Sequence, residues 1–270
     1  MLAIAGLTAA CGGPIHGGQA SKPTTHGSMA PPSGGITSIP GSPVPSSPGG
    51  STSSPDNVPS GGAITNPIPG VFDTQYSPAA PGNYPEQVSG SYTLNGKSVN
   101  VSSTGVLTVR PASASGMQVW AETSGQNQPT DSLAVVFDQQ GASLHTETLG
   151  LTASTLTCIF SPPVPILPTH PVFGSTFRAG ASCGNFSADV NGVVQGTKTI
   201  TLAGVNYATL AVRTTIVTKG TTPATIVETD WVSPALRFVL RSTQTTTTTY
   251  DGFPYQITTI TAVTSLPAPA

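Results

Sequence analysis

Residues 91–101 read SYTLNGKSVNV, and this stretch decides the fold. Asn95-Gly96 stands between two segments in which apolar and polar side chains alternate. An Asn-Gly pair favours the tight two-residue turn that joins antiparallel strands, because both residues tolerate positive φ. The stretch therefore predicts a β-hairpin.

The same pattern continues toward the C-terminus. Residues 245–263, TTTTTYDGFPYQITTITAV, place Asp251-Gly252 between two further alternating segments. Between the hairpins lie short runs rich in β-branched residues, such as LTVR, MQVWAE, LAVVFDQQG, TLTCIF and TIVETDWV. No long segment combines a helical period with helix caps. We predict an all-β fold: a single antiparallel domain over residues 86–266, as a strongly curved sheet or an open barrel.

Alternation within these runs predicts what each face of the sheet carries. We interpret Thr214, Ile216 and Thr218 as part of a pattern with one apolar face and one face covered by hydroxyls. Glu228 and Asp230 alternate on one strand, and we expect them on a solvated polar face.

The N-terminal region has a different composition. The apolar residues MLAIAGLTAA precede Cys11, a pattern typical of the end of a bacterial lipoprotein signal, with the translation start expected further upstream. Residues 1–11 are assigned to this signal, with Cys11 as the lipidated residue. Residues 12–85 are rich in Gly, Pro, Ser and Thr, so we predict a long disordered tether. The predicted location is the extracytoplasmic face of the cell membrane, with a lipid anchor as the membrane contact; the alternative is secretion.

Two cysteines remain, Cys158 and Cys183. An even pair in an exported chain predicts a disulfide.

Charged residues make up only 7% of the chain and the net charge is −2, with Lys and Arg scattered singly. This distribution excludes nucleic acid as a partner, because no basic stripe is present to contact phosphates.

Residues 180–184, GASCG, match the G-x-S-x-G pattern of a hydrolase nucleophile. That role requires a helix after Ser182 and a later histidine, yet no histidine follows His170. No spacing of Cys and His resembles a zinc site, and no glycine-rich loop suits a phosphate. We therefore predict a protein that is not an enzyme and has no cofactor. An enzymatic alternative would need His145 or His170 beside an acid.

Residues 160–241 contain a proline segment with Pro162 and Pro163, then Gly174, then Gly204 and Tyr207, and finally Trp231 followed by Pro234. This arrangement resembles a family of uncharacterised bacterial envelope lipoproteins, chiefly actinobacterial. The shared motif implies packing roles rather than catalysis. Gly204 is expected to supply a positive φ in a turn, and Trp231 to anchor the core.

Two functions fit these observations. In the first, the curved sheet binds an apolar or amphiphilic ligand, by analogy of fold with half-barrel lipid carriers. The ligand contacts would then be Val135, Phe137, Leu210, Val212 and Trp231. In the alternative, the domain is a scaffold or adhesion module that contacts wall polymers or envelope proteins. Residues 162–173, PPVPILPTHPVF, would form the rim of a cavity in the first case and an edge cover in the second.

Overall fold

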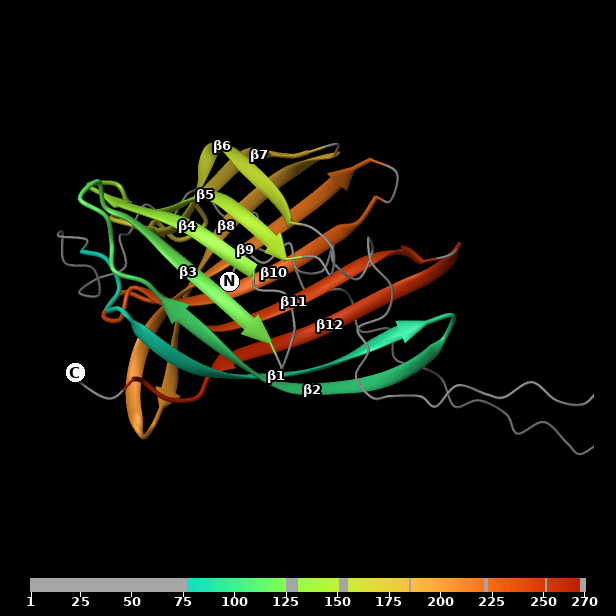
Figure 1. Cartoon of the computed structure of the whole chain (residues 1–270), viewed down its shortest axis with the longest axis horizontal. Helices are drawn as coiled ribbons and strands as arrows, with labels where there is room; N and C mark the ends of the chain where they lie inside the picture. The colour runs from blue at the N-terminus through green and yellow to red at the C-terminus, as the bar shows by residue number, and fades with distance from the viewer. Residues whose placement is uncertain are drawn as a thin grey trace, which may run out of the picture. The chain divides into compact units, whose positions relative to one another are not determined.

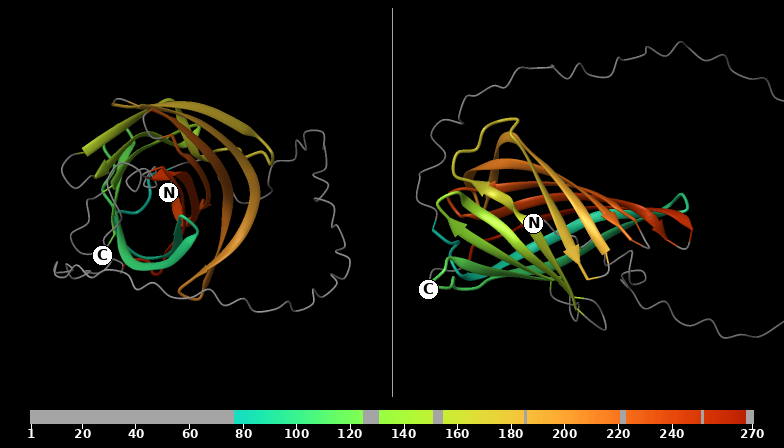
Figure 2. Two further views of the ribbon diagram at one scale, coloured as in Figure 1. Left: turned by 90° about the vertical axis from the view of Figure 1, so that its right-hand side faces the viewer. Right: turned by 90° about the horizontal axis from the view of Figure 1, so that it is seen from above.

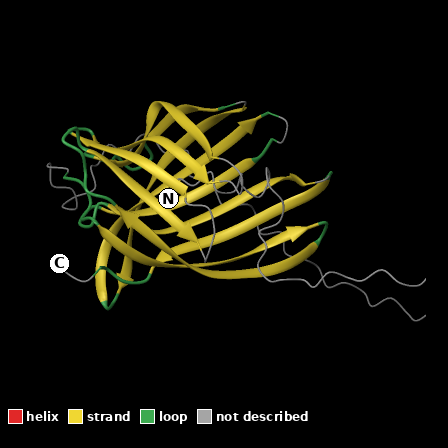
Figure 3. Ribbon diagram, in the orientation of Figure 1, coloured by secondary structure: helices red, strands yellow, loops and turns green. Residues whose placement is uncertain are grey.

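The computed structural model describes residues 77–124, 131–150, 155–184, 186–220, 223–250 and 252–267. These ranges contain twelve β-strands and no helix (Figure 3). In chain order the strands are β1 (Gly82–Leu94), β2 (Lys97–Val109), β3 (Met117–Ser124), β4 (Asp131–Asp138), β5 (Gly141–Gly150), β6 (Thr155–Pro168), β7 (Thr176–Cys183), β8 (Phe186–Leu202), β9 (Val205–Lys219), β10 (Thr225–Ser233), β11 (Phe238–Tyr250) and β12 (Phe253–Val263). The expected signal end with Cys11, and residues 12–76 of the expected tether, lie outside the described residues.

The strands form one antiparallel barrel (Figures 1 and 2). Each strand pairs with the next along the chain, and β1 pairs with β12 from Glu86↔Val263 to Leu94↔Tyr255. The prediction of an all-β, antiparallel and strongly curved domain is confirmed. The prediction left a strongly curved sheet and an open barrel as alternatives, and the structure is a barrel that is closed by the pairing of β1 with β12, which satisfies the backbone groups of both strands.

Tight turns join several of the strand pairs. Asn95 and Gly96 connect β1 to β2 with φ values of 47° and 75°, which confirms the first hairpin. Ala203 and Gly204 connect β8 to β9 with φ values of 50° and 81°. The positive φ expected at Gly204 is therefore present, and it matches the right-handed twist of the strands on either side.

The ordered barrel wall begins earlier than residue 86, which lies inside β1. Ala79, before the strand, is 1% exposed. Its backbone N–H donates to Gln118 Oε1 (3.1 Å), and its carbonyl accepts from Gln118 Nε2 (2.8 Å). The expected domain boundary missed these residues because PAAPG has no strand propensity of its own and is held by β3.

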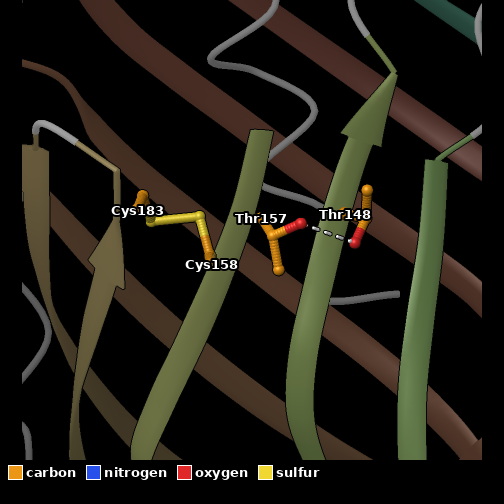
Figure 4. The surroundings of a disulfide bond; sticks show 4 residues. All are labelled: Thr148, Thr157, Cys158 and Cys183. Carbon is orange, nitrogen blue, oxygen red and sulfur yellow. Dashed lines mark hydrogen bonds between the residues drawn. A yellow bond between two sulfur atoms is a disulfide. The ribbon is translucent and has the colours of Figure 1, made fainter. Parts of the chain in front are cut away.

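A disulfide joins neighbouring strands of the wall (Figure 4). Cys158 on β6 and Cys183 on β7 are directly opposed, with Cα atoms 4.1 Å apart, and both side chains are fully buried. Thr157, the residue before Cys158, points to the other face and bonds Thr148 on β5 (3.1 Å). The predicted Cys158–Cys183 bridge is confirmed.

The outer face of the barrel carries many hydroxyl groups. Cross-strand hydroxyl pairs on this face are Thr148 with Thr157, Thr245 with Thr258 (3.2 Å) and Thr93 with Ser98 (2.6 Å). Such pairs stabilise neighbouring strands and suit contact with water. The described residues contain no helix that is long and apolar enough to cross a membrane.

Candidate functional site

The inward-facing side chains form two zones. The apolar zone is a single buried cluster that includes Trp120, Phe137, Leu144 and Leu210. Aromatic contacts hold it together: Tyr84 packs on Phe238 with ring centroids 4.4 Å apart, and the centroids of Trp120 and Phe137 are 6.2 Å apart. This zone is the hydrophobic core of the barrel.

Four of the five predicted ligand contacts belong to this cluster. Val135 and Phe137 face inward from β4, and Leu210 and Val212 face inward from β9. Their exposed fractions are at most 6%. The structure thus places these four side chains together in the interior, and their role as ligand contacts remains a prediction.

Trp231 does not lie inside the barrel, and the prediction that it anchors the core is wrong. Its neighbours Asp230 and Val232 are buried, so strand alternation turns Trp231 to the outer face. There Lys198 Nζ lies 5.2 Å and the Arg241 guanidinium 5.7 Å from the indole centroid. Both distances fit cation–π contacts. The sequence prediction placed Trp231 in the core because the side chain is apolar, although its position in the strand alternation puts it on the outer face.

The second inward zone is polar and was missed in the sequence. Thr214, Thr218 and Ile216 share the inward face of β9, and all three are buried. The interpretation of one hydroxyl face and one apolar face therefore fails on this strand. On β11 threonines occupy both faces, with Thr246 and Thr248 inside and Thr245 and Thr247 outside. A continuous threonine run contains no alternation that would assign its faces.

Acidic side chains also face inward. Glu228 and Asp230 are 1% and 5% exposed, so the expected solvated face is wrong for them. Ser242 Oγ donates to Glu228 Oε1 (2.9 Å). Glu147 on β5 is fully buried opposite Cys158. A sequence pattern gives no sign of this burial, because acidic residues on strands usually face water.

A further acidic group gathers on β1, β3 and β4. Glu86, on the inward face of β1, lies opposite Gly105 of β2 and is 3% exposed. Glu122 on β3 is directly opposite Asp131 on β4. Gly105 is paired with Ser124 of β3 and Leu107 with Glu122, so Glu122 lies diagonally across β2 from Glu86. Glu86, Glu122 and Asp131 are called the acidic triad below.

Burial is the largest cause of the raised pKa values of Glu86 and Glu122. Burial, and after it the charge of Glu122, raises the pKa of Glu86 to about 8. Burial, and then the charge of Asp131, raises the pKa of Glu122. At neutral pH the Glu86 carboxyl group is therefore mainly protonated.

Inward-facing residues next to the triad are open to solvent. Moving along β2 from buried Gly105 toward the hairpin turn, the next inward side chain, Ser103, is exposed. Val99 on the same face is 47% exposed. Ser103 and Val99 belong to the part of β2 that extends beyond its pairing with β3, which ends at Gly105, so the triad lies next to an exposed stretch of β2.

The catalytic candidates are not arranged as an enzyme site. Ser182 is exposed on β7, opposite Ile159 and Ser187, and GASCG forms a strand and turn rather than a strand-to-helix elbow. His145 on β5 contacts Ser143 Oγ (3.3 Å), and His170 is exposed after β6. Residues 162–168 of the proline segment form part of β6 and pair with β5, so they belong to the barrel wall and form neither a cavity rim nor an edge cover.

Across the described ranges no three His, Cys, Asp or Glu side chains are grouped to hold a metal.

Comparisons with known proteins add little. No protein-family model matches the sequence, and no curated protein matches it. A similar solved structure is the crystal structure of the hypothetical lipoprotein YmcC from Escherichia coli K12. It is 14% identical, the match covers 70% of this chain and 91% of that chain, and the TM-score is 0.34. A similarity this low carries no functional argument.

Proposed function

We propose that this chain is a non-enzymatic lipoprotein of the bacterial cell envelope, anchored through Cys11, and that its barrel binds an amphiphilic ligand in the interior. The polar side chains that are buried beside the apolar cluster inside the barrel carry this proposal. Glu86 Oε2, Thr214 Oγ1 and Thr246 Oγ1 are buried inside the barrel and have no hydrogen-bond partner among the residues that the structure describes. Buried polar atoms rarely lack partners, so the head group of an amphiphile is a fitting one.

Access supports the same proposal. Inward-facing Ser103 is exposed and Val99 is 47% exposed, so a ligand can reach the interior surface beside β2. A tail that packs against apolar side chains would be stabilised by about 25 cal/mol for each Å² removed from water.

The anchor and the location rest on the sequence. The apolar run before Cys11 is typical of a lipoprotein signal, and the Cys158–Cys183 disulfide is what an exported protein favours. Replacing Cys11 with serine should move the protein from the membrane to the soluble extracytoplasmic fraction. Retention of the Cys11→Ser variant in the membrane would contradict anchoring through this residue.

Native mass spectrometry of the full chain carrying Cys11→Ser tests ligand binding. We expect a co-purified amphiphile, and after its removal we expect saturable binding of dodecyl maltoside at concentrations below its micelle threshold. The double variant Thr214→Val/Thr246→Val removes two buried hydroxyls with little change of shape and should alter the affinity. Thr229→Val/Thr243→Val, an opposed pair on the outer face, is the matched control. A chain that neither retains nor binds an amphiphile contradicts the proposal.

One observation favours the alternative of a scaffold that contacts wall polymers. Trp231 lies on the outer face with Lys198 and Arg241, and Arg213 projects from the same face of β9. Aromatic and cationic groups together suit an anionic polysaccharide. Loss of sedimentation with anionic wall polymer in a Trp231→Ala/Lys198→Gln variant, but not in Thr229→Val/Thr243→Val, would support this second function.

A further inference from the structure

The acidic triad consists of inward-facing acids on β1, β3 and β4. Glu122 and Asp131 are directly opposed on β3 and β4, so their Cβ atoms are about 5 Å apart. Glu86 lies on β1, diagonally across β2 from Glu122, and the charge of Glu122 contributes to the raised pKa of Glu86. The three acids thus occupy inward-facing positions on β1, β3 and β4.

Glu86 gives an independent indication of a missing partner. Its side chain is 3% exposed, and Oε2 has no hydrogen-bond partner in the described part of the chain. Strand alternation aims this atom inward with Tyr84, the next inward residue on β1. A buried carboxyl oxygen of this kind costs about 1–3 kcal/mol unless something binds it.

We infer that the acidic triad binds the cationic head group of an amphiphile whose tail reaches into the barrel, with Glu86 as the principal contact. This inference rests on the proposed function and specifies the ligand class. An ammonium group between carboxylates would gain charge-assisted contacts and remove the repulsion among the three acids. A neutral or anionic head group would gain neither.

The surroundings of Glu86 favour a cation over other ligands. On the inward faces beside it, β2 contributes Ser103 and Leu107, and β12 contributes Thr261 and Val263, none of which is charged. Tyr84 is the titratable neighbour on β1, and burial raises its pKa, so it stays neutral. The other inward acids are Glu147, Glu228 and Asp230. Lys97 is inward on β2 but lies at the distant hairpin turn.

Binding of a cation should depend on pH. The pKa of Glu86 is raised to about 8, so a cation that requires the carboxylate must displace a proton at pH 7. Affinity for a quaternary ammonium, which does not itself titrate, should therefore increase from pH 6 to pH 9. Binding at pH 7 should also release protons, which calorimetry in buffers of different ionisation enthalpy measures.

The experiment compares three ligands with the same dodecyl chain below their micelle thresholds: dodecyltrimethylammonium, dodecyl maltoside and dodecyl sulfate. The full chain carrying Cys11→Ser is titrated with each by calorimetry at pH 7 and pH 9. We expect the quaternary ammonium, which has no N–H to donate, to bind roughly tenfold to hundredfold more tightly than the maltoside through charge attraction to the carboxylates. Glu86→Gln should reduce this preference at least about tenfold and weaken its pH dependence, with Glu122 left as the remaining group of raised pKa.

Asp189→Asn is the matched control, because Asp189 is an exposed acid on β8 that pairs with Lys219. It should leave the preference unchanged. Equal affinity for ammonium and maltoside would overturn the inference and leave the proposed function standing, whereas no binding of any of the three would overturn both. Equal loss of preference in Asp189→Asn would indicate a general charge effect and would also overturn the inference.

Discussion

Cys158 and Cys183 are opposed across β6 and β7 and are joined by a disulfide that closes a segment with a sequence separation of 25. A bridge of that span restricts the unfolded chain by about 3 kcal/mol on the loop-entropy model. Cys158→Ser/Cys183→Ser should lower the free energy of unfolding by about that amount, measured by urea denaturation. Exposed Ser182 lies next to Cys183, and Ser182→Ala should cause no measurable change. A double variant as stable as the parent would contradict the prediction.

Glu86 predicts a pH-dependent stability. Burial, followed by the charge of Glu122, raises its folded-state pKa to about 8, above its usual value of 4.5. The folded state therefore holds the proton more tightly, so this group lowers stability as pH increases from about 4.5 to 8. Glu86→Gln removes the effect and should stabilise the chain at pH 9 by up to about 5 kcal/mol, with little change at pH 4.5.

Urea denaturation of the parent and of Glu86→Gln at both pH values checks this difference. Asp189→Asn, on the outer face, serves as the comparison and should show no such pH dependence. A stabilisation of Glu86→Gln that is the same at pH 4.5 and pH 9 would mean that the carboxyl group is not responsible.

The two tryptophans report on different faces of the wall. Trp120 is 1% exposed inside the barrel, and its Nε1 donates to Gln118 Oε1 (3.0 Å), whereas Trp231 lies on the outer face. In Trp231→Phe the remaining emission should be blue-shifted, resist iodide quenching and change when an amphiphile binds. In Trp120→Phe the emission should be quenched by iodide and should not respond to the ligand. A ligand response confined to Trp231 would place binding on the outer face.

The fold could be predicted from the sequence to a large extent because its signals are local. Asn95-Gly96 specifies a turn by its own backbone preference, and Cys158 with Cys183 forms a pair by elimination among three cysteines. Closure of the barrel could not be predicted, because it depends on the pairing of β1 with β12, which are distant in sequence. Burial of Glu86 was equally hidden, since it depends on Gly105 and on side chains from other strands.

Gln118 tests how the segment before β1 is held. It is fully buried, and its side-chain amide makes four hydrogen bonds: Oε1 accepts from the backbone N–H of Ala79 and from Trp120 Nε1, and Nε2 donates to the carbonyls of Ala79 and Arg110. Because Leu has a similar size without the amide, Gln118→Leu would leave these partners unsatisfied. Each buried unsatisfied group costs about 1–3 kcal/mol, so the variant should lose roughly 3 kcal/mol or more of stability.

Gln87 supplies the control for this measurement. It lies on the outer face of β1, and its Nε2 bonds Ser102 Oγ and the carbonyl of Ser103 where water can replace the lost contacts. Gln87→Leu should therefore change the free energy of unfolding by less than about 0.5 kcal/mol. If Gln118→Leu changed the free energy of unfolding by as little as Gln87→Leu, the Gln118 amide would not be the group that holds Ala79 against β3. Among the described contacts, Ala79 has no hydrogen bond to a side chain of β3 other than those of Gln118. A large loss of folding stability in Gln118→Leu, together with faster proteolysis before residue 82, would therefore show that the barrel wall depends on the residues that precede β1.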